Sequence, residues 1–161
     1  MTDMIRNKAI GALTVAAAIA LPIAAEARQL TVTATMKPYR GDGAYLALYV
    51  TDAQGRVHST LHVAGPKAKY HRHLSGWNSA AGAARRPIDG VTGASVGSGR
   101  TLKVSVDIAD ALIDAGYQLR VDSAVEDQRD APSDAVAPLS SAANGKAQAG
   151  STYIQSLRVD F

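Results

Sequence analysis

A serine lies among small residues in DGVTGAS, residues 89–95, and a second run of small residues, VGSGR, follows it. The segment from Gly93 to Gly97 matches G-x-S-x-G, the nucleophile elbow of α/β-hydrolases, with Ser95 as the nucleophile. That motif needs a strand before it, a helix after it and a histidine later in the chain. All four histidines precede Ser95, and Gly97 and Gly99 disfavour a helix. The sequence therefore excludes a hydrolase of that fold.

The same region approaches the phosphate-loop pattern G-x-x-x-x-G-K-[ST] between Ala94 and Thr101. Ala94 replaces the first glycine of the pattern, and Arg100 replaces the lysine. A phosphate loop opens a helix whose N-terminus holds the anion, whereas alternating residues after Thr101 predict a strand. A phosphate loop is therefore excluded as well.

The histidines are candidate metal ligands. On one strand, His58 and His62 would lie about 13 Å apart at about 3.3 Å per residue, too far to share one ion. An extended pair formed by His71 and His73 could chelate copper or zinc, but it would need further ligands, and no acidic residue follows before Asp89. A metal-binding module using His71 and His73 is one alternative, and histidines that simply face solvent are the other.

The composition narrows the class of protein. The 161 residues suit one domain, and they include a single tryptophan, Trp77, which either fills the core or borders a ligand held by the following loop. A dispersed net charge of +3 and an aromatic content of 5% argue against a nucleic-acid partner. The absence of cysteine excludes thiol catalysis, c-type haem attachment, iron–sulfur ligation and a lipid-modified cysteine.

The first residues are typical of a secretory signal peptide. Arg6 and Lys8 precede an apolar run at 9–20, Pro22 interrupts it, and Ala-Glu-Ala at 25–27 has the small-x-small pattern of a cleavage site. The apolar run is shorter than the roughly 20 residues that span a bilayer. We therefore expect a cleaved signal at 1–27, a periplasmic domain at 28–161 and no stable membrane anchor.

Alternation of apolar and polar residues predicts a β protein. The turn sequence DAQGR predicts a hairpin between the second and third strands. Six strands with turns between them favour an antiparallel β-sandwich, and a small barrel is the alternative. The expected strands are residues 30–36, 44–51, 57–63, 101–108, 117–125 and 152–161.

The segments between these strands give weaker signals. Residues 67–77 have weak helical character that we expect to end at Gly76, and 78–100 show no periodicity. The sequence ADALIDAG predicts a short helix or a wide connection. Residues 126–150, rich in alanine, serine, proline and aspartate, predict a long mobile loop.

With the hydrolase and the phosphate loop excluded, DGVTGAS resembles the D-x-x-[ST]-G-A-[TS] signature that FAD:protein FMN transferases recognise. These exported, Mg²⁺-dependent enzymes move FMN from FAD onto a protein hydroxyl as a phosphoester and release AMP. The resemblance implies that Ser95 is the covalent attachment site, where threonine is more usual. The motif residues that it implicates in cofactor binding are Asp89, Gly90, Thr92, Gly93, Ala94 and Ser95. We add Trp77, Tyr70 and Arg100 as candidate contacts to the flavin ring or its phosphate.

The wider chain, from about Arg40 to Phe161, resembles a bacterial periplasmic family of unknown function, number 2271. In that family a similar hairpin, a tryptophan, this loop and late strands follow in the same order. The resemblance implies an immunoglobulin/fibronectin-like antiparallel β-sandwich with long loops. It also implies an electron-transfer protein with covalent FMN, which acts with the transferase and a membrane flavin reductase and has no substrate of its own. Residues 127–150 are longer than the family's usual connection.

The residue types suit such a modification. A transferase must draw the acceptor hydroxyl into its own active site, and the glycines on either side of Ala94 allow backbone conformations closed to other residues. Ala94 adds no bulk, and Asp89 can cap the turn or face the transferase's metal. Ser95 has no base in its own sequence surroundings, so the transferase would activate it. The alternatives that remain are a periplasmic interaction or structural domain without flavin and the His71/His73 metal module.

Overall fold

A computed structural model describes residues 26–81 and 92–161 of the chain. The predicted signal peptide therefore lies almost wholly outside the described residues. Within the described ranges, no helix is long and apolar enough to cross a membrane.

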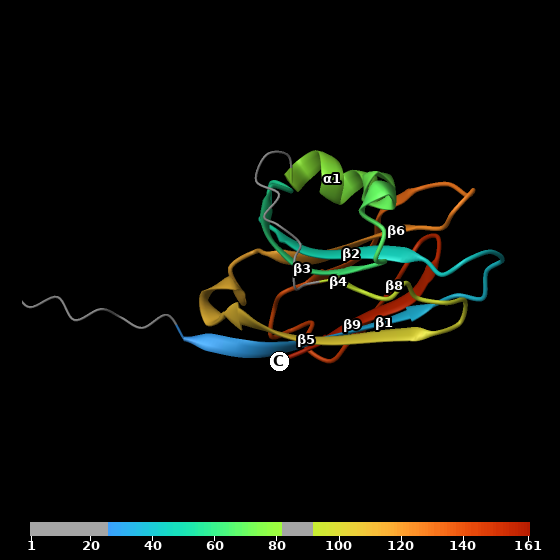
Figure 1. Cartoon of the computed structure of the whole chain (residues 1–161). Helices are drawn as coiled ribbons and strands as arrows, with labels where there is room; N and C mark the ends of the chain where they lie inside the picture. The colour runs from blue at the N-terminus through green and yellow to red at the C-terminus, as the bar shows by residue number, and fades with distance from the viewer. Residues whose placement is uncertain (1–25, 82–91) are drawn as a thin grey trace, which may run out of the picture.

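Two β-sheets pack face to face (Figure 1). Neighbouring strands are antiparallel except for the short β3–β4 pair, which is parallel. The prediction of a β-sandwich is confirmed, and the separation into two sheets excludes a small barrel. The four-stranded sheet has the order β5 (Thr101–Ala109), β1 (Ala27–Met36), β9 (Ile154–Asp160) and β8 (Ala147–Ala149). The five-stranded sheet has the order β4 (Thr92–Gly93), β3 (Val57–Ala64), β2 (Tyr45–Thr51), β6 (Gln118–Ala124) and β7 (Ala131–Pro138).

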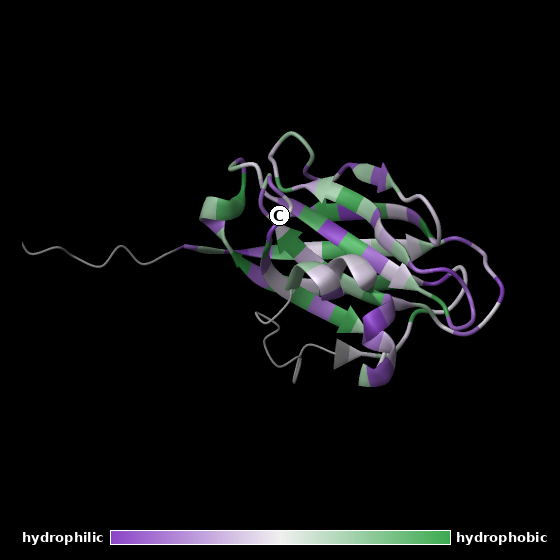
Figure 2. Ribbon diagram, turned by 90° about the horizontal axis from the view of Figure 1, so that it is seen from above, coloured by the Kyte–Doolittle hydropathy of each residue, from purple (hydrophilic) through white to green (hydrophobic). Residues whose placement is uncertain are grey.

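The main hydrophobic core lies between the two sheets because alternate residues of each strand point inward. From Leu30 to Met36 of β1 the inward positions are all buried, whereas the threonines between them are half-buried. Figure 2 shows this alternation as green and purple blocks along the strands. Large buried residues of this core include Leu30, Val32, Met36, Leu46, Leu48, Leu119, Val121, Ile154, Leu157 and Val159.

A helical segment covers the outer face of the five-stranded sheet (Figure 1). It consists of the 3₁₀ helix η1 (Ala68–His73) and the α-helix α1 (Ser75–Ala81), and Trp77 of α1 packs with Tyr49 in a second core cluster. The expected helical character is confirmed, but the helix runs past Gly76 to Ala81. The segment ADALIDAG forms only a short 3₁₀ helix, η3 (Asp110–Leu112), followed by turns.

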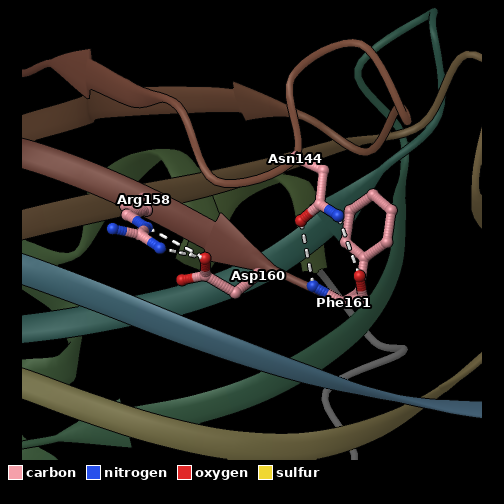
Figure 3. Close-up of polar contacts among 4 residues, drawn as sticks. All are labelled: Asn144, Arg158, Asp160 and Phe161. Carbon is pink, nitrogen blue, oxygen red and sulfur yellow. Dashed lines mark hydrogen bonds and ion pairs between the residues drawn. The ribbon is translucent and has the colours of Figure 1, made fainter.

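The prediction of a long loop at 126–150 is wrong. Strand β7 pairs with β6 from Gln118↔Pro138 to Ser123↔Ala131, and β8 pairs with β9. The connection between β7 and β8 is attached to the end of the chain, where the Asn144 side chain donates to the Phe161 carbonyl at 2.8 Å and accepts from its N–H at 3.0 Å (Figure 3). Beside it, Arg158 pairs with Asp160 on β9 (Figure 3).

Candidate functional site

The loop that contains Ser95 joins the edges of the two sheets. Thr92 and Gly93 pair with Val63 and Ala64 at the end of β3, and the Gly93 carbonyl accepts from the Gly65 N–H at 2.8 Å. After residues 94–100 the chain enters β5, the edge strand of the other sheet. In Figure 1 this loop lies at the same end of the sandwich as the loop between β1 and β2. Ser95 is thus carried between two fixed strand ends.

Val96 anchors the loop immediately after Ser95. It is buried and exchanges two backbone hydrogen bonds with Ala44, of 2.7 and 2.9 Å. The Tyr39 hydroxyl reinforces this bridge, because it donates to the Val96 carbonyl at 2.7 Å and accepts from the Ala44 N–H at 2.9 Å. Burial raises the pKa of the Tyr39 phenol, which keeps it protonated and able to donate. These contacts fix the backbone one residue away from the candidate acceptor.

Ser95 itself is exposed, with its side chain against Gly43. A Cβ atom at position 43 would lie 2.5 Å from Ser95 Oγ and 3.0 Å from Ser95 Cβ. Only glycine leaves room for the observed position of the hydroxyl. This contact was not predictable from the sequence, because Gly43 is far from Ser95 along the chain and no local pattern links the two.

A hollow of about 380 Å³ opens beside Ser95, between the edges of the two sheets. His62 and Gly93 belong to one edge, and Leu102 and Val104 of β5 belong to the other. The His62 ring lies against Gly93, since a Cβ atom there would be 3.1 Å from both Cε1 and Nε2 of the imidazole. In the sequence, His62 is a candidate metal ligand only, and no local pattern predicts its place beside the motif.

The electrostatics of the hollow favour an anion. The exposed residues Arg100 and Lys103 are part of its lining, which includes no acidic residue in the part of the chain that the structure describes. Burial lowers the pKa of His62, so its imidazole is neutral at neutral pH. Arg100, a predicted contact to the flavin ring or its phosphate, lines the same hollow as Ser95.

Trp77 and Tyr70 lie elsewhere. Trp77 has no exposed surface, and its indole N–H donates to Thr60 at 2.8 Å in the second core cluster. Its backbone N–H donates to the buried carboxylate of Asp122 at 2.6 Å. Tyr70 lines a separate cleft of about 310 Å³, where its hydroxyl donates to Glu126 at 2.7 Å. Neither residue lines the hollow beside Ser95, so the geometry gives their predicted flavin contacts no support.

The motif residues Asp89 and Gly90 lie outside the described residues, and of Thr92 only the backbone is described. Gly93, Ala94 and Ser95 all line the hollow. The structure thus brings the last three residues of the motif together at one surface.

His71 and His73 lie on η1 and do not form an extended pair. The buried His71 has Nε2 at 2.9 Å from the Gly65 carbonyl oxygen, which requires a proton on that nitrogen and removes it as a metal ligand. His73 Nδ1 lies 3.1 Å from Asp130. No group of three or more histidine, cysteine, aspartate or glutamate residues in the described ranges is arranged to hold a metal ion.

The family described as "Predicted periplasmic protein (DUF2271)" matches residues 27–156, and the chain belongs to this family. Membership confirms the family resemblance seen in the sequence and agrees with the expected periplasmic location. No curated protein and no solved structure matches the chain.

Proposed function

We propose that this family member is a periplasmic electron-transfer protein that carries FMN as a phosphoester on Ser95. The observation that carries the proposal is the exposed hydroxyl of Ser95, held beside a cationic hollow by a loop whose next residue is fixed. An acceptor for an external transferase must be reachable, and its backbone must present one geometry. Ser95 meets both requirements, since the side chain is exposed while Val96 is bonded to Ala44.

The residues around Ser95 fit an FMN phosphate. A phosphate that bridges Ser95 and the flavin retains one negative charge, and Arg100 and Lys103 line the same hollow. The absence of a side chain at Gly43 leaves the hydroxyl's position open. When bound, the flavin would supply the redox chemistry, and the protein would position it and set its electrostatic surroundings.

In the transfer, the Ser95 oxygen would attack the FMN phosphorus of FAD, and the bond from that phosphorus to the AMP oxygen would break. AMP leaves, and the serine proton passes to a base of the transferase. Among the described residues, the only neutral base that lines the hollow is His62, whose ring is packed against Gly93. The partners of the protein are accordingly a FAD:protein FMN transferase and, for electron exchange, a membrane redox protein such as a flavin reductase.

A periplasmic interaction or structural domain without flavin is the second candidate, favoured by the many polar side chains that remain exposed on β5. The immunoglobulin/fibronectin type of the sandwich and the signal peptide at 1–27 also stay predictions.

The test is expression of the full chain with and without an active FAD:protein FMN transferase, followed by intact mass and in-gel fluorescence. We expect one adduct of FMN mass that requires the transferase and disappears in Ser95→Ala. Ser95→Thr should keep the adduct because threonine also offers a hydroxyl. Ser105→Ala, an exposed serine of β5 outside the loop, is the matched control and should also keep it. If a transferase that modifies another acceptor protein leaves this chain unmodified, the proposal is wrong.

A further inference from the structure

We propose that the hollow beside Ser95 is the binding site for the flavin's planar ring system, with His62 as its polar contact. The inference rests on the proposed function, because it names the site on this protein that the attached group occupies. In the part of the chain that the structure describes, the site lies at one side of the sandwich, between β3–β4 and β5.

The opening follows from the shortness of β4. Its two residues pair only with Val63 and Ala64, so the remainder of β3 has no neighbour on that side among the described residues. Facing it is β5, whose one partner strand within residues 26–81 and 92–161 is β1. Packed sheets lie about 10 Å apart, so the gap between two such edges admits a flat group rather than a globular one. The volume of about 380 Å³ falls within the roughly 300–1,000 Å³ typical of ligand pockets.

The walls of the hollow have the character that a planar heteroaromatic ligand requires. Leu102 and Val104 pack against the main core but remain only half-buried, so each leaves apolar surface in the hollow. Opposite them, the His62 imidazole gives a polar edge. Burial is the sole cause of its lowered pKa, with no hydrogen bond from any described residue contributing. An apolar wall with one convergent polar group is the usual composition of a small-molecule site.

The position of Ser95 ties this site to the modification. Ser95 lines the hollow itself, together with the exposed basic residues Arg100 and Lys103. A ring attached through a phosphate and a ribityl chain can therefore fold back into the hollow, with the phosphate left beside the exposed cations.

The cleft of Tyr45 and Tyr70 is the competing location for the ring. It contains two tyrosine rings 5.5 Å apart, but none of the motif residues lines it. Its charged lining combines Arg72 with the carboxylates of Glu126 and Asp127. Two carboxylates oppose a group that is attached through a phosphate and accepts electrons. The hollow is therefore the favoured site, and binding in the tyrosine cleft is an outcome that the test must detect.

The first measurement uses riboflavin, which lacks the phosphate, and full-chain Ser95→Ala protein, which cannot be modified. We expect saturable quenching of riboflavin fluorescence. His62→Ala and Val104→Lys, each added to Ser95→Ala, should weaken binding by tenfold or more. His62→Asn should retain part of the affinity because it keeps a polar edge. Tyr70→Ala is the matched control and should leave affinity unchanged, and circular dichroism of each variant verifies folding.

The second measurement uses the flavinylated protein and the quenching of its fluorescence by iodide. We expect the attached flavin to be shielded several-fold relative to free FMN, and His62→Ala or Val104→Lys to remove the shielding. An adduct that is as accessible as free FMN overturns the ring site and leaves the proposed function standing. The ring site is also overturned if Tyr70→Ala removes the shielding of the attached flavin and the His62 and Val104 variants do not. If no adduct forms, the proposed function fails, and riboflavin binding alone decides the ring site.

Discussion

Replacing Asp134 by asparagine should lower the stability of the fold strongly, although it hardly changes the shape of the side chain. Its buried carboxylate accepts six hydrogen bonds, three on each oxygen. Four come from consecutive backbone N–H groups, three in the connection between β8 and β9 and one at the first residue of β9, and the others come from side-chain hydroxyls. The six donors are Ser123 Oγ, Ser151 N, Ser151 Oγ, Thr152 N, Tyr153 N and Ile154 N.

Asp134→Asn keeps the shape of the side chain but turns one acceptor oxygen into an NH₂ donor. Of the three donors on that oxygen, the serine hydroxyl can turn and accept from the new NH₂, but the two backbone N–H groups lose this acceptor and face a donor. The remaining three donors lose the charge of the carboxylate. A hydrogen bond to a charged group contributes about 1.5–3 kcal/mol, and a donor left exposed to water recovers part of that loss. We therefore expect a loss of about 3–5 kcal/mol in the free energy of unfolding, a large part of the roughly 5–15 kcal/mol of a typical domain.

The pH dependence provides a second test of the same residue. Burial raises the pKa of Asp134, but the hydrogen bonds from Ser123 and the 152–154 backbone outweigh it and hold the pKa below the ordinary carboxyl value. A lowered pKa means that the unfolded state binds more protons, so this stabilisation exists above the ordinary carboxyl pKa and is lost on acidification through the folded-state pKa. The difference between wild type and Asp134→Asn should shrink below about pH 4.

Urea unfolding followed by circular dichroism measures both effects, provided that the slope m is unchanged. Asp114→Asn is the matched control, because Asp114 also accepts two hydrogen bonds from Ser141 but is exposed to solvent. We expect it to cost much less than Asp134→Asn. Equal losses for the two variants, or a difference from wild type that does not depend on pH, would refute the reasoning.

Three further predictions follow. Gly43→Ala should slow modification of Ser95 at least tenfold, because the new Cβ would displace the hydroxyl. The rate of adduct formation measures this effect. In the control Gly97→Ala, the nearest contact of the new Cβ would be at 3.4 Å, and the wild-type rate should be retained. Trp77→Phe should lower the free energy of unfolding by about 2–3 kcal/mol, because it leaves a cavity and removes the hydrogen bond to Thr60. The flavin content of the folded protein should stay unchanged. A variant that keeps full stability but loses flavin would contradict this. Burial lowers the pKa of His62, so the folded protein binds fewer protons there than the unfolded chain does. Wild type should therefore lose stability on acidification through the ordinary histidine pKa of about 6.5, and His62→Gln should remove this loss. Identical pH profiles of stability for wild type and His62→Gln would contradict the prediction.

The strands with alternating large residues were predictable from the sequence. In β1 and β5 the pattern of apolar and polar side chains coincides with inward and outward positions, so period and burial agree. Strand β7 was missed for the opposite reason. Its sequence, APSDAVAP, has small residues and two prolines, and it is a strand because it pairs with β6 and because Asp134 ties it to the β8–β9 connection. That pairing joins distant segments and leaves no local pattern.

The residues of the candidate site also differ in whether a local sequence pattern predicts them. The motif loop and the hydroxyl of Ser95 were visible in the sequence, since a run of small residues around one nucleophile is a local feature. Gly43, Tyr39 and His62 were not, because each acts through a contact with a residue far along the chain. Trp77 shows the converse limit, since its proximity in sequence to the loop does not place it on the same surface.

The two backbone bonds between Ala44 and Val96 have a consequence for the order of maturation. An unfolded chain contains the same residues as the loop but lacks this bridge and the Tyr39 hydroxyl that supports it. A transferase that reads the folded geometry would act only after the sandwich has assembled, so the yield of fluorescent adduct would count the molecules that have folded. A variant remote from Ser95, such as Asp134→Asn, would then lower that yield only as far as it lowers the folded fraction, making the adduct a folding reporter within the cell envelope.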